Sequence, residues 1–137
     1  MKIVIDTNVL IAGLLRDSLV RAILNFSNNL FYFSEYSVNE IIEHKSELIE
    51  KTDYSEEEFD EVLNLILSKL NFISDEEIVP FISQAEEVMK EIDIEDYPLI
   101  AVALTINADG IWTFDNHFKR QNKIKVFDTN EIFELMK

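Results

Sequence analysis

Four acidic residues, widely separated in the sequence, have the residue type and the local setting of metal ligands: Asp6, Glu40, Asp96 and Asp115. Carboxylates gathered in this number repel one another unless a cation lies among them. Oxygen-only ligands suit a hard divalent ion such as Mg²⁺ or Mn²⁺. A cluster of this size is typical of two-metal phosphodiester hydrolysis. The four acids therefore predict a metal-dependent hydrolase in which water is the nucleophile.

Short polar side chains accompany two of these acids. Thr7 and Asn8 follow Asp6, and Asn116 follows Asp115. One such side chain is enough to cap a helix, so this surplus favours a site, and we expect these residues to orient ligands or water. Each of the four acids, taken alone, also fits a structural role as a helix cap or as a charge near a helix N-terminus. Their convergence at one edge of the fold favours function over capping.

A second copy of the first tripeptide is predicted to be structural. Asp128-Thr129-Asn130 repeats Asp6-Thr7-Asn8, but Glu131 follows at the spacing of a capping box. We therefore expect Asp128 to cap the closing helix and to take no part in chemistry.

Short apolar runs alternate with amphipathic segments along the chain. Strands are expected over residues 1–5, 30–33, 71–74, 111–114 and 124–127, with a further short one at 78–79. Helices are expected over residues 8–15, 18–28, 55–70, 80–91 and 93–107, and also from Ser37, where Glu40 would complete a capping box, and after Asp128. This alternation predicts a three-layer α/β/α domain around a mainly parallel sheet. Ligands of such sheets bind at the carboxyl edge, where Asp6 and Asp115 end their strands and where Glu40 and Asp96 begin their helices.

Composition excludes several classes of protein. The 137 residues suit one domain, spanning residues 1–137, and the absence of Cys excludes disulfide scaffolds and thiolate metal sites. Two His residues do not make a conventional zinc site. An acid at position 6 and the lack of an 18-residue apolar run argue against a signal peptide and a membrane span. We expect a soluble, cytoplasmic protein with no membrane association.

The charge is strongly negative and unevenly distributed. Lys and Arg number 12 against 27 Asp and Glu, so the formal net charge is −15, which opposes binding to nucleic acid through the overall field. Most of the acids lie between residues 35 and 96, whereas residues 117–125 contain no acid. The basic residues of that segment are Lys119, Arg120, Lys123 and Lys125, so a negatively charged ligand would approach the chain there.

At these acids the chain resembles the PIN-domain family of metal-dependent ribonucleases, which includes the toxin components of prokaryotic toxin–antitoxin pairs. The similar segments are residues 3–10, 37–42, 96–104 and 108–115, one around each acid. Thr113 stands at the family's small hydroxyl position before the fourth acid. Two departures are His117, where some members carry a further acid, and Phe114, where a small residue is common.

The resemblance implies a sheet in the order 3-2-1-4-5 and an endoribonuclease that cuts single-stranded or loop RNA. With RNA as the substrate, we expect RNA contacts from Lys119, Arg120, Lys123 and Lys125. Its catalytic residues would be Asp6, Glu40, Asp96, Asp115 and Thr113, and the four acids would hold Mg²⁺ or Mn²⁺. A toxin role would bring a cognate antitoxin whose basic tail enters the acidic cleft. The resemblance and the number of apolar helix faces also predict a homodimer.

Two other functions remain open at this stage. An Asp-nucleophile phosphohydrolase would use Asp6, but the haloacid-dehalogenase pattern has a second Asp where this chain has Asn8. A catalytically weak PIN-like module that binds RNA or scaffolds a partner is a further alternative, against which the complete set of four acids argues.

Overall fold

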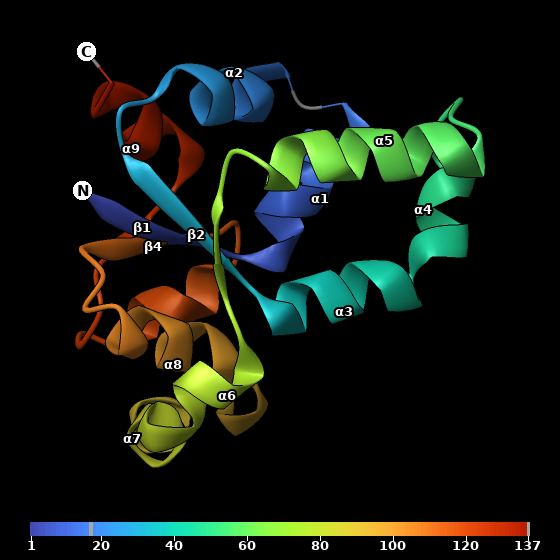
Figure 1. The fold of residues 1–137 in the computed structure, drawn as a ribbon. Helices are drawn as coiled ribbons and strands as arrows, with labels where there is room; N and C mark the ends of the chain where they lie inside the picture. The colour runs from blue at the N-terminus through green and yellow to red at the C-terminus, as the bar shows by residue number, and fades with distance from the viewer. Residues whose placement is uncertain (17, 137) are drawn as a thin grey trace.

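Five parallel strands form the centre of the fold (Figure 1). The computed structural model describes residues 1–16 and 18–136. The strands are β1 (Lys2–Ile5), β2 (Leu30–Ser34), β3 (Asn71–Ile73), β4 (Gly110–Trp112) and β5 (Val126–Phe127). Their order is β3-β2-β1-β4-β5, and Val4 of β1 pairs with Tyr32 on one side and Ile111 on the other. The predicted sheet order is confirmed.

Helices cover both faces of the sheet, because consecutive side chains of a strand point to opposite faces. Ile3 and Ile5 enter one apolar cluster, and Val4 enters the other. The first cluster packs under α1 (Thr7–Leu15), α2 (Ser18–Phe26), α3 (Glu35–Glu43), α4 (Lys45–Glu50), α5 (Glu56–Leu67) and α9 (Thr129–Glu134). The second packs under α6 (Asp75–Ile78), α7 (Ile82–Met89) and α8 (Tyr97–Thr105), joined by the short 3₁₀ turns η1 (Val79–Phe81) and η2 (Ile94–Asp96). The three-layer architecture is thus confirmed.

The third helix begins earlier than expected. The chain turns into α3 directly after β2, so Ser34 is the N-cap, and its Oγ accepts a hydrogen bond of 3.0 Å from the backbone N–H of Ser37. The predicted capping box between Ser37 and Glu40 is therefore wrong. Glu40 lies in the second turn of α3 and takes no part in capping that helix.

The predicted cap of the closing helix is confirmed, whereas the short strand predicted at residues 78–79 is wrong. The capping box of Asp128 with Glu131 is present as expected. A second capping box joins Ser55 and Glu58 at the start of α5, and Pro98 lies in the first turn of α8. The predicted strand at residues 78–79 is wrong, because Ser74 caps a helical turn there and the chain continues into η1. No helix in the described part of the chain is long and apolar enough to cross a bilayer.

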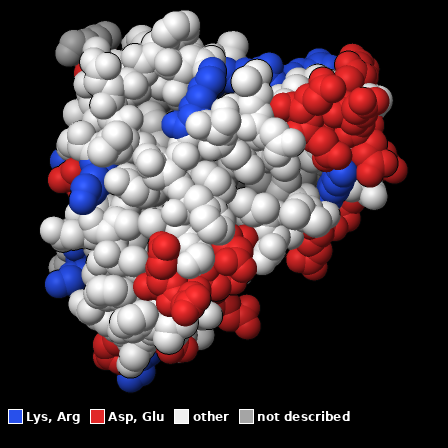
Figure 2. All heavy atoms as spheres, viewed as in Figure 1, with Lys and Arg blue, Asp and Glu red and all other residues white. Residues whose placement is uncertain are grey.

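Acidic side chains gather in two places on the face seen in Figure 2. The first turn of α5 carries Glu56, Glu57 and Glu58, and the first turn of α6 carries Asp75, Glu76 and Glu77. Acids at helix N-termini interact favourably with the helix dipole. Part of the negative charge of the chain therefore has a structural explanation.

Candidate active site

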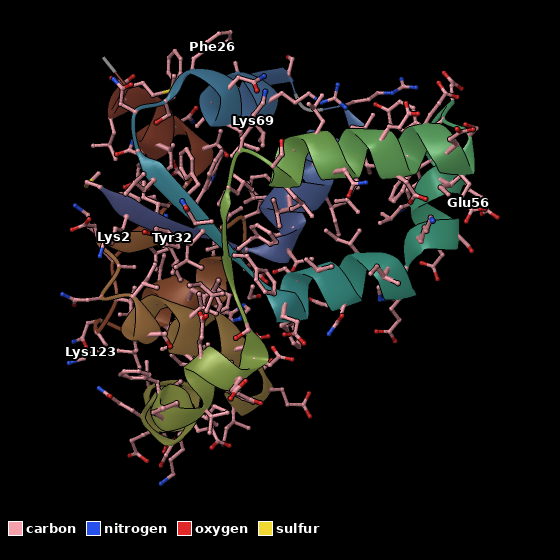
Figure 3. The ribbon with its side chains drawn as sticks, in the orientation of Figure 1. Lys2, Phe26, Tyr32, Glu56, Lys69 and Lys123 are labelled. Carbon is pink, nitrogen blue, oxygen red and sulfur yellow. The ribbon has the colours of Figure 1, made fainter. Side chains whose placement is uncertain are left out.

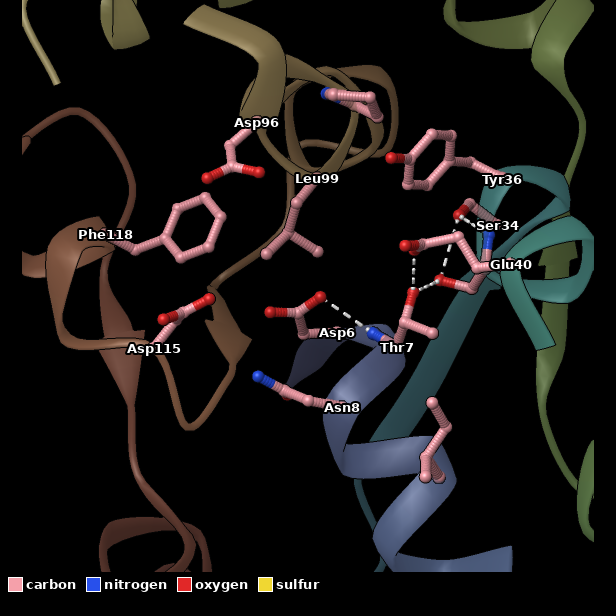
Figure 4. Close-up of a pocket in the computed structure, with 13 residues that line it drawn as sticks. Asp6, Thr7, Asn8, Ser34, Tyr36, Glu40, Asp96, Leu99, Asp115 and Phe118 are labelled. Carbon is pink, nitrogen blue, oxygen red and sulfur yellow. Dashed lines mark hydrogen bonds between the residues drawn. The ribbon is translucent and has the colours of Figure 1, made fainter. Parts of the chain in front are cut away.

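A pocket of about 240 Å³ opens at the carboxyl edge of the sheet (Figure 4). All four predicted acids line it, together with the predicted supporting residues Thr7 and Asn8. The rest of its lining is Ile11, Ser34, Tyr36, Ser37, Pro98, Leu99 and Phe118. The topology brings these residues together because β1 and β4 are neighbours in the sheet and α3 and α8 begin at the same edge.

Asp6 follows β1 and is held by two hydrogen bonds. Its Oδ1 accepts from the backbone N–H of Thr7 at 2.7 Å, and its Oδ2 accepts from the Thr113 hydroxyl at 2.6 Å. Burial, and then the charges of Asp115 and Glu40, raise the pKa of Asp6 to about 6 against the lowering effect of these hydrogen bonds. A cation in the pocket would relieve this cost by stabilising the ionised carboxylate.

Glu40 is held by a residue of α1. Its Oε1 accepts a hydrogen bond of 2.6 Å from the Thr7 hydroxyl, which also lies 2.8 Å from the Ser37 hydroxyl. Thr7 and Ser37 are both buried. The supporting role predicted for Thr7 therefore has a concrete contact in the structure, the fixing of Glu40.

Asp96 stands at the N-cap position of α8 but makes no capping hydrogen bond. Its Oδ2 instead lies 2.5 Å from Nε2 of His117. Burial is the main cause that raises the pKa of Asp96, although the contact with His117 lowers it. Capping therefore does not explain this acid.

His117 also contacts the fourth acid. Asp115 begins η3 (Asn116–Arg120) without capping it through its side chain, and its Oδ1 lies 3.3 Å from Nδ1 of His117. The His117 ring stacks on Phe118 at a centroid distance of 4.5 Å. His117 thus links two acids of the pocket, a role that was not predicted from the sequence. The signals in the sequence were its spacing of two residues from Asp115 and its place where some members of the family carry a further acid.

Thr113 connects Asp6 and Asp115 from behind the pocket. It is 3 % exposed and does not line the pocket, and its hydroxyl donates to Asp6 while accepting from the backbone N–H of Asp115 at 3.0 Å. Asn116 is exposed and lies outside the lining. Phe114 also lies outside it, so the aromatic residue in the lining from this segment is Phe118.

Asn8 carries a polar atom without a partner. Its Oδ1 is buried and, within the described residues, makes no hydrogen bond. The pocket is lined by four carboxylates and by Asn8, whose buried side-chain oxygen has no partner among the described residues. Oxygen atoms of such groups are the ligands that Mg²⁺ and Mn²⁺ prefer. In the side-chain positions described for residues 1–16 and 18–136, no three of the acids or His residues surround one point as ligands. The donor set fits a hard divalent ion in its chemistry.

The four basic residues predicted to bind RNA lie away from this pocket. Lys119, Lys123 and Lys125 line a separate hollow of about 550 Å³, and Arg120 lines a third. The hollow of about 550 Å³ also includes Asp109, and Asp109 and Lys125 immediately precede β4 and β5, so it lies at the amino edge of the sheet. In Figure 3 Lys123 and Lys2 project on the same side of the molecule, opposite Glu56. Any RNA contact made by these lysines would thus lie outside the pocket that the acids line.

Comparison with known proteins identifies the family. A family profile described as "PIN domain" matches residues 4–132. The fold is similar to a chain in the crystal structure of VapBC2 from Rickettsia felis bound to a DNA fragment from their promoter, with a TM-score of 0.70 and 20% sequence identity over 93% of this chain and 98% of that chain. No curated protein matches the sequence. On the strength of the profile match and of the fold, this chain belongs to the PIN-domain family.

Proposed function

We propose that this protein is an endoribonuclease dependent on Mg²⁺ or Mn²⁺, and that the carboxyl-edge pocket is its active site. The observation that carries the proposal is that carboxylates from four separate segments of the chain line this one pocket. Membership of the PIN-domain family supports the same conclusion.

Asp6, Glu40, Asp96 and Asp115 are the residues proposed to hold the ions. When bound, a divalent ion would lower the pKa of a water molecule and offset charge on the phosphodiester. The raised pKa of Asp6 supports this assignment, because a buried carboxylate among others gains most from a nearby cation. Asn8 is proposed to turn its unpaired oxygen to an ion or to water.

Other residues would position these ligands. Thr113 holds Asp6, Thr7 holds Glu40, and His117 contacts both Asp96 and Asp115. Residues that orient metal ligands usually affect metal affinity or activity by about 10–100-fold when they are changed. We therefore assign Thr113 to positioning, although its place before the fourth acid alone would suggest catalysis.

We propose single-stranded or loop RNA as the substrate. The pocket, at about 240 Å³, is smaller than the roughly 300–1,000 Å³ that is typical of drug-sized ligands. A double helix does not enter such a space, whereas an unpaired nucleotide can be splayed into it. The basic residues Lys119, Arg120, Lys123 and Lys125 are proposed to bind the RNA backbone farther from the cut.

We also propose a toxin role in the cytoplasm, with a cognate antitoxin as partner and a homodimer as the working form. The similar fold in VapBC2, a complex, supports a protein partner. A basic segment of the antitoxin would complement the four acids. Exposed apolar side chains at the end of α2 and just after α9, namely Phe26 and Leu135, suit an interface between protomers.

One observation favours a second candidate, a catalytically weak RNA-binding module. His117 stands where some members of the family carry a further acid, and it already contacts Asp96 and Asp115. Both features would weaken the binding of a second metal ion. The Asp-nucleophile phosphohydrolase receives no comparable support, since no Lys lines the pocket among the described residues.

The decisive experiment compares Asp6→Asn with Asp128→Asn, a matched control in the same tripeptide. Asp128 caps α9 and lies outside the pocket. We expect the wild type and Asp128→Asn to bind Mn²⁺ by titration calorimetry and to cleave a fluorescent single-stranded RNA, with EDTA abolishing cleavage. Asp6→Asn should lose more than about 100-fold in cleavage, because even indirect partners of a metal cost about 10–100-fold. A wild type that binds no Mn²⁺ and cuts no RNA would favour the non-catalytic module.

A further inference from the structure

One wall of the proposed active site is apolar. Tyr36, Pro98, Leu99 and Ile11 line the pocket beside the carboxylates. A metal site needs only polar ligands, so the four acids do not account for this wall. This wall therefore offers apolar surface to whatever occupies the pocket, although Ile11 and Leu99 also pack against the apolar clusters of the fold.

Helical spacing explains how the two kinds of residue come to face the same space. Residues three or four apart lie on one face of a helix. Tyr36 precedes Glu40 by four residues on α3, and Leu99 follows Asp96 by three at the start of α8. Each acid-bearing helix therefore presents an apolar side chain one turn from its carboxylate.

Tyr36 differs from the other aromatic residue of the pocket in its accessibility. Its side chain is 44% exposed, whereas Phe118 is 3% exposed and is covered by the His117 ring. In Figure 4 Tyr36 lies across the pocket from Asp96 and Asp115. Tyr36 is thus the aromatic ring in this lining that a ligand can reach while its phosphate lies among the acids.

We propose that Tyr36 stacks against the base of the nucleotide whose phosphate binds at the carboxylates. This inference rests on the proposed function and adds the residue that binds the base. A planar base fits against an aromatic ring, and such stacking accepts every base because each has a π-face. A paired base is already stacked within its helix, so the contact selects unpaired nucleotides.

The test is a thermodynamic cycle that combines a substitution at Tyr36 with a change of ligand, from 5′-AMP to ribose 5-phosphate. Binding to the Mn²⁺-loaded protein is measured by titration calorimetry. The two ligands share the ribose phosphate, and 5′-AMP carries adenine where ribose 5-phosphate carries a hydroxyl group. Wild type should bind 5′-AMP about tenfold more tightly than ribose 5-phosphate, the effect of one stacked base. Tyr36→Leu should remove this preference and leave ribose 5-phosphate binding unchanged, whereas Tyr36→Phe should keep it.

Phe114→Leu is the matched control. Phe114 is 45% exposed at the same edge of the sheet but does not line the pocket, so its replacement should leave the preference intact. Equal affinity of Tyr36→Leu and wild type for 5′-AMP would overturn the inference while leaving the proposed function standing. An equal loss of affinity for both ligands in Tyr36→Leu would also overturn it. So would a loss of the preference for 5′-AMP in Phe114→Leu as large as that in Tyr36→Leu. A wild type that binds Mn²⁺ but neither ligand would overturn this inference, whereas the proposed function fails only when the wild type cuts no RNA.

Discussion

At the scale of single residues, Asp6 combines two roles that its sequence context presents as alternatives. Its Oδ1 caps α1 through the N–H of Thr7, while its Oδ2 is held by Thr113 beside the other carboxylates. A cap alone would not require burial or a second hydrogen-bond donor. The raised pKa of Asp6 means that ionising this carboxylate in the pocket costs free energy of folding, which can be measured as a pH-dependent stability.

The free energy of unfolding of the metal-free protein should fall as the pH rises from about 4 to about 6. The pKa of Asp6 rises from 3.8 to about 6 on folding, so the folded chain binds more protons than the unfolded chain between these values. The loss is complete above the folded pKa and amounts to at most about 3 kcal/mol. Asp6→Asn should therefore be more stable than wild type at pH 7.5, by roughly 1–3 kcal/mol, and nearly equal to it at pH 4.

Urea unfolding in EDTA at the two pH values measures this difference. Asp96 and Asp75 also have raised pKa values, but they are present in both proteins, so the comparison isolates Asp6. Adding Mn²⁺ should stabilise wild type and not Asp6→Asn. Parallel pH profiles of the two proteins would contradict the prediction.

At the scale of elements, the pairing of β4 with β5 supports the fourth acid. The backbone N–H of Thr113 donates to the carbonyl of Phe127 at 3.2 Å, just before the chain turns to Asp115. Gly110 makes this pairing possible, because a Cβ there would lie 2.4 Å from Cε2 of Phe127 and 3.0 Å from the carbonyl oxygen of Lys125. The requirement for glycine here comes from close approach, and no unusual backbone angle is involved.

Gly110→Ala should lower the free energy of unfolding by about 1–3 kcal/mol, the usual cost of overpacking a core. Gly13→Ala is the control. Its Cβ would meet Cγ1 of Val20 at 3.1 Å, and the higher helix propensity of Ala, about 1 kcal/mol, offsets that tightness. Urea unfolding of both variants measures the contrast, and an equal effect at the two glycines would refute the packing argument.

At the scale of the whole molecule, charge is segregated. Acids lie in the pocket and at the N-terminal ends of α5 and α6, while residues 117–125 carry four of the 12 basic residues. Gln121 fixes the loop after η3: its side chain donates to the carbonyls of Phe118 and Ile124 and accepts from the backbone N–H groups of Lys123 and Ile124. The loop therefore presents its lysines in a set arrangement on a chain of net charge −15.

Charge reversal in this loop should weaken RNA binding without affecting the metal. In a plot of the logarithm of RNA affinity against the logarithm of salt concentration, the double variant Lys123→Glu, Lys125→Glu should have a shallower slope than the wild type. The difference should be about one unit for each lysine that pairs with a phosphate in the wild type. Lys51→Glu, Lys69→Glu carries the same net charge but leaves the loop intact, so it is the control. The measurement is fluorescence anisotropy with a labelled RNA over a salt series, with Mn²⁺ titration alongside. Equal weakening of RNA binding in the two double variants would mean that only the overall charge matters.

The sequence by itself determined the alternation of strands and helices, the capping box of α9 and the acids that meet at one edge of the sheet. These features depend on the periodicity of apolar residues, on capping hydrogen bonds between residues at most four apart, and on the rule that parallel strands end at a common edge of the sheet. The start of α3 was misplaced because two serines could cap it and the end of β2 decided between them. Only the tertiary structure paired Thr113 with Asp6, 107 residues apart, and Thr7 with Glu40, 33 apart. It also brought His117 to two acids, opened Tyr36 to the pocket and separated the basic loop from it. Such contacts depend on how whole helices pack on the sheet, and this packing cannot be predicted from the residues next to each position in the chain.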